Sequence, residues 1–97
     1  MNVNDKQRKY LGGLAQDIKP TVYVGTSGVT DGVIGELSRS LEHHELIKVK
    51  LRLGNREARD EAVQALVAAS GADLIKRIGN TAILYRRRSD DPKISLP

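Results

Sequence analysis

The sequence predicts an α/β fold of the α+β kind, with helices mainly on one face of a four-stranded mixed sheet. Three observations predict it. Apolar residues change between helical and strand spacing along the chain, strand-like segments are separated by helical ones, and a two-residue link, Gly79-Asn80, joins the last two strands. The predicted order is α-β-α-β-α-β-β. A length of 97 residues without an internal repeat supports a single domain. We expect this domain over residues 1–88 and a polar tail over residues 89–97.

Three helices are predicted from their start and stop signals. Each follows a residue whose side chain can cap a helix, and these residues are Asn4, Thr30 and Asn55. The first helix is predicted over residues 5–17, because the residue before a proline avoids helical geometry and Lys19-Pro20 follows. Gly71 is the expected end of the third helix. His43 and His44 are expected to end the second, where a protonated imidazole suits the helix dipole.

The strands are predicted over residues 21–25, 46–53, 72–78 and 81–86. In the second strand, apolar residues alternate with Lys48, Lys50 and Arg52, which gives one apolar and one cationic face. The helices should therefore lie mostly on the apolar face, and the other face should be at least partly open. The last two strands should form a hairpin around Gly79-Asn80.

Composition excludes several classes of protein. The chain has no cysteine, which excludes disulfides, thiolate metal sites and cysteine nucleophiles and fits a reducing compartment. The first ten residues are polar and contain no apolar run typical of a signal peptide. No stretch approaches the roughly 18 apolar residues of a membrane span. We therefore expect a cytoplasmic protein.

The net charge of +4 is unevenly distributed along the chain. One group of cations is Lys48, Lys50 and Arg52, and a second is Lys76, Arg77, Arg86, Arg87 and Arg88. A face with cations and no acids attracts polyanions, and binding to RNA through several phosphates would depend strongly on salt. The alternative is that these side chains are only the solvated face of a strand and a solubilising strand end.

A Gly-x-x-Gly sequence, Gly25 to Gly28, lies between the first strand and the second helix. One interpretation is a plain turn, since glycine adopts backbone conformations that other residues avoid. The other is that residues without side chains let a sugar-phosphate backbone approach the start of a helix. The segment does not match a P-loop, because the Gly-Lys-Ser/Thr ending is missing, and it does not match a nucleophile elbow, because Val29 replaces the last glycine.

No catalytic or metal site is expected. His43 and His44 are adjacent, so on a helix they point about 100° apart and cannot chelate one metal ion together. Acidic residues are scattered over the helices, and no serine lies in a catalytic motif. Tyr10, Tyr23 and Tyr85 are expected in the core or partly buried. We therefore expect neither catalysis nor a cofactor.

Three stretches of the sequence together resemble a known family. They are LGGLAQDIKPTVYVGTSGVTDGVI, LEHHELIKVKL and IGNTAILYR, followed by the terminal KISLP. They resemble the CRM domain (chloroplast RNA splicing and ribosome maturation), and more narrowly its stand-alone bacterial YhbY-type form. The resemblance extends from Leu11 to Pro97.

The resemblance implies a fold like the C-terminal domain of bacterial translation initiation factor three, and RNA binding without catalysis. Bacterial members are associated with precursors of the large ribosomal subunit, whereas plant relatives are fused into group II intron splicing factors. The expected function is thus RNA binding in large-subunit assembly, by a monomer. The alternative is a module that binds ribosomal proteins or an assembly factor. The expected RNA-binding residues are Gly25, Thr26, Ser27, Gly28, Lys48, Lys50, Arg52, Arg77, Arg86, Arg87 and Arg88.

Overall fold

Side-chain caps start all three helices. The computed structural model describes residues 3–97, and its α-helices are α1 (Asp5–Leu14), α2 (Asp31–His44) and α3 (Arg56–Ser70). The side-chain oxygens of Asn4, Thr30 and Asn55 accept the N–H group three residues ahead at 2.8, 3.2 and 2.8 Å, respectively. Each cap satisfies a backbone donor that the first turn leaves unpaired. The three predicted helix starts are confirmed.

The helix ends follow the sequence with one difference. α1 stops at Leu14, and the chain continues as a 3₁₀ turn, η1 (Ala15–Asp17), before it becomes extended at Ile18. The segment predicted as one helix over residues 5–17 therefore tightens in its last turn, a common way to end a helix. α3 ends at Gly71 in the left-handed conformation, with φ 72°, as predicted. His43 and His44 are the last residues of α2.

Four short strands form one mixed sheet. They are β1 (Val22–Val24), β2 (Leu46–Leu51), β3 (Asp73–Ile78) and β4 (Thr81–Tyr85), and their order in the sheet is β1-β2-β4-β3. β1 and β2 are parallel, because α2 carries the chain back between them, whereas β4 is antiparallel to both β2 and β3. The predicted mixed sheet and terminal hairpin are confirmed.

An irregularity in β3 changes which side chains share a face. Leu74 pairs with Leu84 and Lys76 pairs with Ile83, so Ile75 is an extra residue between two consecutive pairs. Such a β-bulge interrupts the alternation of the strand. As a result, Lys76 lies in register with Ile83 on one face and Arg77 with Ala82 on the other.

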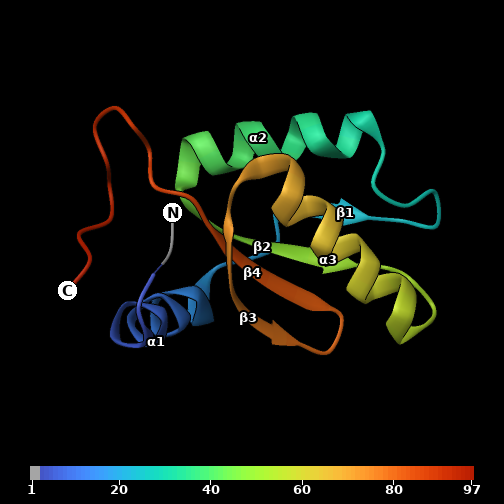
Figure 1. Ribbon diagram of the computed structural model, residues 1–97, viewed down its shortest axis with the longest axis horizontal. Helices are drawn as coiled ribbons and strands as arrows, with labels where there is room; N and C mark the ends of the chain where they lie inside the picture. Colours follow the sequence, from blue (N-terminus) through green and yellow to red (C-terminus); the bar gives the residue numbers. More distant parts are fainter. Residues whose placement is uncertain (1–2) are drawn as a thin grey trace.

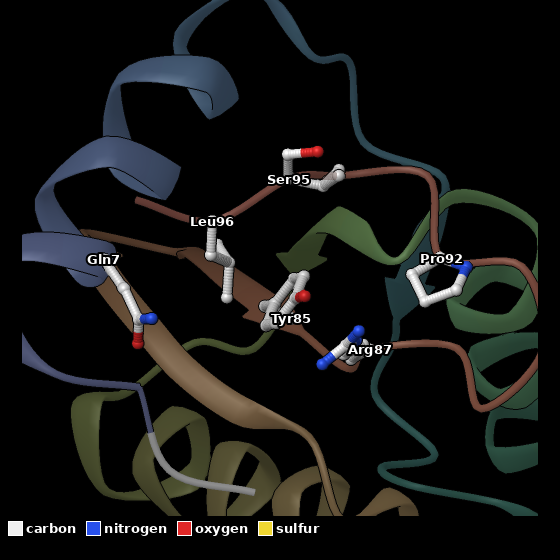
Figure 2. Close-up of a pocket in the computed structure, with 7 residues that line it drawn as sticks. Gln7, Tyr85, Arg87, Pro92, Ser95 and Leu96 are labelled. Atoms are coloured by element: carbon white, nitrogen blue, oxygen red, sulfur yellow. The ribbon is translucent and has the colours of Figure 1, made fainter.

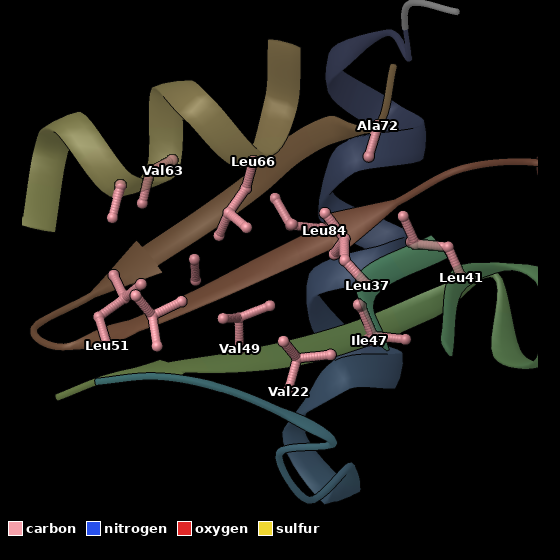
Figure 3. Packing of buried hydrophobic residues seen from close by; sticks show 13 residues of the cluster. Val22, Leu37, Leu41, Ile47, Val49, Leu51, Val63, Leu66, Ala72 and Leu84 are labelled. Atoms are coloured by element: carbon pink, nitrogen blue, oxygen red, sulfur yellow. The ribbon is translucent and has the colours of Figure 1, made fainter. Parts of the chain in front are cut away.

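α2 and α3 cover one face of the sheet (Figure 1). Between them and the sheet lies the larger hydrophobic cluster, in which Leu37 and Leu41 of α2 meet Leu66 of α3 over the strands (Figure 3). The strands contribute the alternate residues Ile47, Val49 and Leu51, together with residues of β1 and β4. Each such side chain stabilises the fold by about 1.5–3 kcal/mol relative to an exposed position.

The opposite face of the sheet is covered only at one end. There α1 and the last residues of the chain pack on Leu46, Ile83 and Tyr85, and form a second, smaller cluster. Residues 89–97 contain no helix or strand, but Ile94 and Leu96 pack against this cluster. The tail is therefore part of the packed structure although it forms no regular element.

Glu45 holds the tail in place. Its residue is fully buried, and its carboxylate oxygens accept the N–H groups of Arg88, Lys93 and Ile94 at 2.7–2.9 Å. Its backbone carbonyl accepts the N–H of Arg86 at 2.9 Å. Burial raises the pKa of this carboxyl, but the three N–H donors and the charge of Arg88 outweigh burial and leave the pKa below its ordinary value.

The connections are divided between two ends of the sheet (Figure 1). We call one the loop end, formed by residues 25–30, 52–55 and 79–80. Hydrogen bonds join these connections, because Arg52 N–H donates to Val24 and Leu51 N–H donates to Asn80, both at 2.7 Å. We call the other the tail end, formed by residues 86–97 and the end of α2. The two ends are separated by the length of the strands.

Candidate nucleic-acid interface

The Gly-x-x-Gly segment forms one tight turn at the loop end. The N–H of Gly28 donates to the carbonyl oxygen of Gly25 at 2.9 Å, which makes Thr26 and Ser27 the central residues of a β-turn. Both central residues are exposed. Within residues 3–97, no protein acceptor bonds their N–H groups. The turn therefore presents two backbone donors that a ligand with oxygen acceptors can use.

The two glycines of the turn differ in what they require. Gly28 has φ +76°, a conformation that L side chains rarely adopt, so the turn itself needs glycine there. Gly25 lies outside this region, and a Cβ atom built on it would meet nothing within 4 Å. The protein's own packing thus gives no reason for glycine at position 25. Its bare backbone leaves space for a partner.

A shallow groove separates the turn from α3. It has a volume of about 340 Å³, and its α3 side consists of Ala58, Ala62 and Ala65 with Glu61 beside them. The charge of Glu61 disfavours a phosphate inside this groove. A phosphate at the turn is therefore favoured on the side away from α3, and the uncovered part of the sheet begins two residues before the turn, at Tyr23.

That uncovered part, which we call the open face, carries a concentration of cations. It is formed by Tyr23, Lys48, Lys50, Arg52, Lys76, Ile78 and Thr81. Register places Tyr23, Lys50, Thr81 and Ile78 in one row across the four strands. Lys48, Ile83 and Lys76 form the next row, in which Ile83 is buried below α1. Neither row contains an acidic residue.

Arg52 connects the open face to the glycine turn. Its backbone N–H bonds the carbonyl of Val24, and its guanidinium lies 4.6 Å from the centroid of the Tyr23 ring. This distance is that of a cation–π contact, which stabilises by about 0.5–1 kcal/mol at an exposed site. Val24 directly precedes Gly25, so these two contacts hold Arg52 beside the turn. The charge of Arg52 and the bare backbone of Gly25 are therefore close together.

Arg77 lies at the loop end but on the other side of the sheet. Its Nη1 donates to Asp60 of α3 at 2.7 Å. Successive side chains of a strand point to opposite faces, and the bulge at Ile75 sets which of the two neighbours lies on which face, Lys76 on the open face and Arg77 on the other. The sequence grouped these two cations together, whereas the structure places them on opposite faces.

Arg86, Arg87 and Arg88 lie at the tail end and do not form one patch. Arg86 Nη1 donates to the carbonyl of Ser70 at 3.0 Å, at the end of α3. Arg87 lies beside Tyr85 in a hollow of about 490 Å³ below the tail (Figure 2). The backbone N–H of Arg88 bonds Glu45. β4 runs antiparallel to β2, so these residues are carried to the end of the sheet opposite the glycine turn.

Comparison with known proteins places this architecture in a family. The sequence profile of the CRS1 / YhbY (CRM) domain matches residues 3–86. This chain belongs to the CRM domain family. The match begins before α1 and ends directly after β4, so it includes the turn and the open face.

Curated relatives of this CRM domain are named for RNA binding. One is an RNA-binding protein of Haemophilus influenzae, 40% identical over 95 residues, which cover 98% of this chain and 95% of the relative. Another is a probable RNA-binding protein of Pseudomonas aeruginosa. It is 40% identical over 87 residues, which cover 90% of this chain and 84% of the relative. The probable RNA-binding protein YqeI of Bacillus subtilis is 36% identical over 92 residues, which cover 95% of this chain and 96% of the relative.

A solved structure has the same fold. The solution structure of the hypothetical protein SAV1595 from Staphylococcus aureus superposes on this CRM domain with a TM-score of 0.84 at 31% identity. The alignment covers 99% of this chain and 100% of the other. The α+β arrangement predicted from the sequence is therefore that of a solved protein.

Two tyrosines of this CRM domain lie elsewhere than the sequence predicts. Tyr85 is 1% exposed, as predicted, but Tyr10 and Tyr23 are 43% and 44% exposed. Tyr23 alternates with the buried Val22 and Val24, so its position between two core residues of a short strand was a usable signal for the opposite face. The open face therefore contains an aromatic ring that the sequence analysis expected in the core or partly buried.

The described part of this CRM domain shows no group of three or more His, Cys, Asp or Glu side chains that could hold a metal ion. The His43 and His44 rings meet edge to face at 4.6 Å. Over the same residues, no helix is both long and apolar enough to cross a membrane.

Proposed function

We propose that this CRM domain binds RNA without catalysis, through the glycine turn and the open face. The observation that carries the proposal is that Lys48, Lys50, Arg52 and Lys76 share one face, without an acid in its two rows, next to a turn with bare backbone. The names of its relatives support the same ligand.

The binding mode follows from the chemistry of these groups. The free N–H groups of Thr26 and Ser27 donate to a phosphate oxygen of the RNA backbone. The ammonium and guanidinium groups neutralise neighbouring phosphates and release their counterions. Tyr23 and the guanidinium on its ring offer a flat surface for an unpaired base. Such contacts fix the position of the RNA mainly through its backbone.

The proposed biological ligand is ribosomal RNA in precursors of the large subunit, bound in the cytoplasm by a monomer. This assignment rests on the resemblance to stand-alone bacterial members of the family. Arg86, Arg87 and Arg88, also expected as RNA contacts, could reach only RNA that extends to the tail end.

The salt dependence of RNA binding tests the proposed surface. A fragment of large-subunit ribosomal RNA should bind with an affinity that falls steeply between about 50 and 200 mM salt. In the double variant Lys50→Gln/Arg52→Gln, the slope of log affinity against log salt should decrease by roughly 0.7–0.9 for each lost contact. Fluorescence anisotropy of labelled RNA measures both quantities.

The matched control is Arg39→Gln, which removes an exposed arginine of α2 away from the open face. It should leave the slope unchanged. If Arg39→Gln lowered the slope as much as the double variant, RNA would bind without preference for the open face. If the unmodified protein bound no RNA, the proposed function itself would be wrong.

Sedimentation of a cell lysate distinguishes ribosomal RNA from a protein partner. In a sucrose gradient, the protein should travel with particles near the large subunit at low salt and leave them as salt rises. Association that survives digestion of the RNA would instead favour the alternative, a module that binds ribosomal proteins or an assembly factor.

A further inference from the structure

A second cationic site lies at the loop end, on the side of the sheet away from the open face. It is a hollow of about 320 Å³ between the first turns of α3 and the β3–β4 hairpin. Its lining residues are Arg56, Arg59, Asp60, Arg77 and Gly79. None of them belongs to the glycine turn or to the open face.

The charges in this hollow do not cancel. Three guanidinium groups and one carboxylate leave two net positive charges. The hydrogen bond from Arg77 lowers the pKa of the Asp60 carboxyl, slight desolvation opposes it, and the charges of Arg77, Arg56 and Arg59 lower it further. Asp60 is therefore ionised at neutral pH and offsets only one of the three cations.

Two of the arginines are held in place by the protein. Arg59 Nη1 donates to the carbonyl of Leu53 at 3.0 Å, and Arg77 bonds Asp60. A guanidinium already fixed in position loses little conformational freedom when it binds an anion. Gly79 has φ +57°, and a Cβ built on it would meet nothing within 4 Å, so the hairpin leaves the hollow uncovered.

The same two arginines have unused donors. The Nε atoms of Arg59 and Arg77 are buried, and neither has a hydrogen-bond partner among the described residues. A buried N–H without an acceptor costs about 1–3 kcal/mol, more for a charged group. These Nε atoms are closed off from solvent, so an anion in the hollow bonds the exposed guanidinium nitrogens first and removes this cost only where the two side chains turn toward it.

We propose that the hollow between α3 and the hairpin binds a phosphate group of the same RNA. A phosphate offers several oxygen acceptors in the geometry that guanidinium groups recognise. The site rests on the proposed function and extends it: an RNA strand that crosses the open face continues over the loop end and places a further phosphate beside Arg56, Arg59 and Arg77. The domain thus holds RNA from both sides of its sheet.

The double variant Arg56→Gln/Arg59→Gln tests this site. It should lower the slope of log affinity against log salt by roughly 0.7–0.9 for each lost contact. The matched control is Arg39→Gln, which removes an exposed arginine of α2 outside both cationic surfaces. Urea unfolding shows whether the double variant is folded. If it is not, the single variant Arg56→Gln replaces it, because Arg56 makes no side-chain hydrogen bond within residues 3–97.

A second readout reports on the hollow directly. In ¹H–¹⁵N spectra of the unmodified protein, the Nε–H signals of Arg59 and Arg77 should shift on addition of RNA. Two oligonucleotides that differ only in a 5′-phosphate or a 5′-hydroxyl identify the source: a tighter complex with the 5′-phosphate, lost in the variant, assigns a terminal phosphate. Equal affinities with a reduced slope in the variant assign an internal one.

The results that would contradict the phosphate site in the hollow differ from those that would contradict RNA binding itself. If the double variant keeps the full slope while Lys50→Gln/Arg52→Gln lowers it, RNA binds the open face and does not use the hollow. If inorganic phosphate shifts the Nε–H signals but RNA does not, the hollow is an anion site unrelated to RNA. Absence of RNA binding by the unmodified protein would end both proposals.

Discussion

Glu45 is the residue with the greatest structural consequence outside the interface. Its φ of 64° is unusual for a residue with a side chain, and such a conformation costs about 1–2 kcal/mol. The three hydrogen bonds that its carboxylate accepts offset this cost. They also join the end of α2 to the last residues of the chain. One side chain thus determines both how a helix ends and where the tail lies.

Replacing this carboxylate should weaken the fold in a pH-dependent way. At pH 7, Glu45→Gln should lower the free energy of unfolding by about 2–4 kcal/mol, because its NH₂ group faces backbone donors. The pKa of Glu45 is lower in the folded state, so its stabilisation is complete above the ordinary value of about 4.3 and is lost as pH falls through the folded pKa. The variant should therefore lose less stability than the unmodified protein upon acidification.

Urea titrations at several pH values measure this difference. Glu36→Gln removes an exposed carboxylate from the same helix and should change stability at pH 7 by less than about 0.5 kcal/mol. Parallel pH profiles for the unmodified protein and Glu45→Gln would show that Glu45 is not the group responsible.

At the scale of elements, the β1–α2 turn combines the two interpretations that its sequence allows. Gly28 is needed for the fold because of its positive φ, whereas Gly25 is not constrained by the fold. A Gly-x-x-Gly spacing cannot distinguish these roles, because it does not specify which glycine has the left-handed conformation. In the structure, Gly28 provides the backbone conformation that the turn needs, and Gly25 leaves open space beside the turn.

Substitutions at the two glycines should therefore have different effects. Gly28→Ala should lower the free energy of unfolding by about 1 kcal/mol, through backbone strain. Gly25→Val should change stability little but weaken RNA binding, because its side chain occupies the space proposed for the RNA backbone. Urea unfolding and anisotropy with the same RNA measure the two effects. Unchanged RNA affinity in Gly25→Val would reduce the segment to a plain turn.

Local signals in the sequence predict most elements but not their partners. Asn4, Thr30 and Asn55 act within their own helices, so their roles could be predicted from adjacent residues. The strand order β1-β2-β4-β3 depends instead on contacts between distant segments. For this reason the sequence could not show that Arg86 lies opposite the glycine turn. The bulge at Ile75, which decides that Lys76 and not Arg77 lies on the open face, leaves no clear signature either.

At the scale of the whole molecule, stability and proposed binding are concentrated at opposite ends. The tail end contains Glu45, the smaller cluster and the packed residues Ile94 and Leu96. The loop end contains the glycine turn, Arg52 and the hollow beside α3. A change at one end should therefore affect one property and leave the other intact.

Removal of residues 92–97 tests this separation. The shortened chain loses the packing of Ile94 and Leu96 and two N–H donors to Glu45, and should be less stable by roughly 2–5 kcal/mol. Where it is folded, it should bind RNA with unchanged affinity. Urea unfolding and anisotropy give both values, and Ser95→Ala is the control within the tail. An unchanged unfolding midpoint would mean that the tail does not pack in solution.

The closeness of the first turns of α1 to the last residue has a practical consequence. Gln7, in the first turns of α1, donates to the carbonyl of Pro97, so the beginning of α1 and the last residue lie together at the side of the molecule away from the glycine turn (Figure 1). A neighbouring domain, a fluorescent reporter or an immobilisation tag joined at that side would project away from the nucleic-acid surface. The fold can thus carry an attached module at this side while the proposed RNA surface stays uncovered.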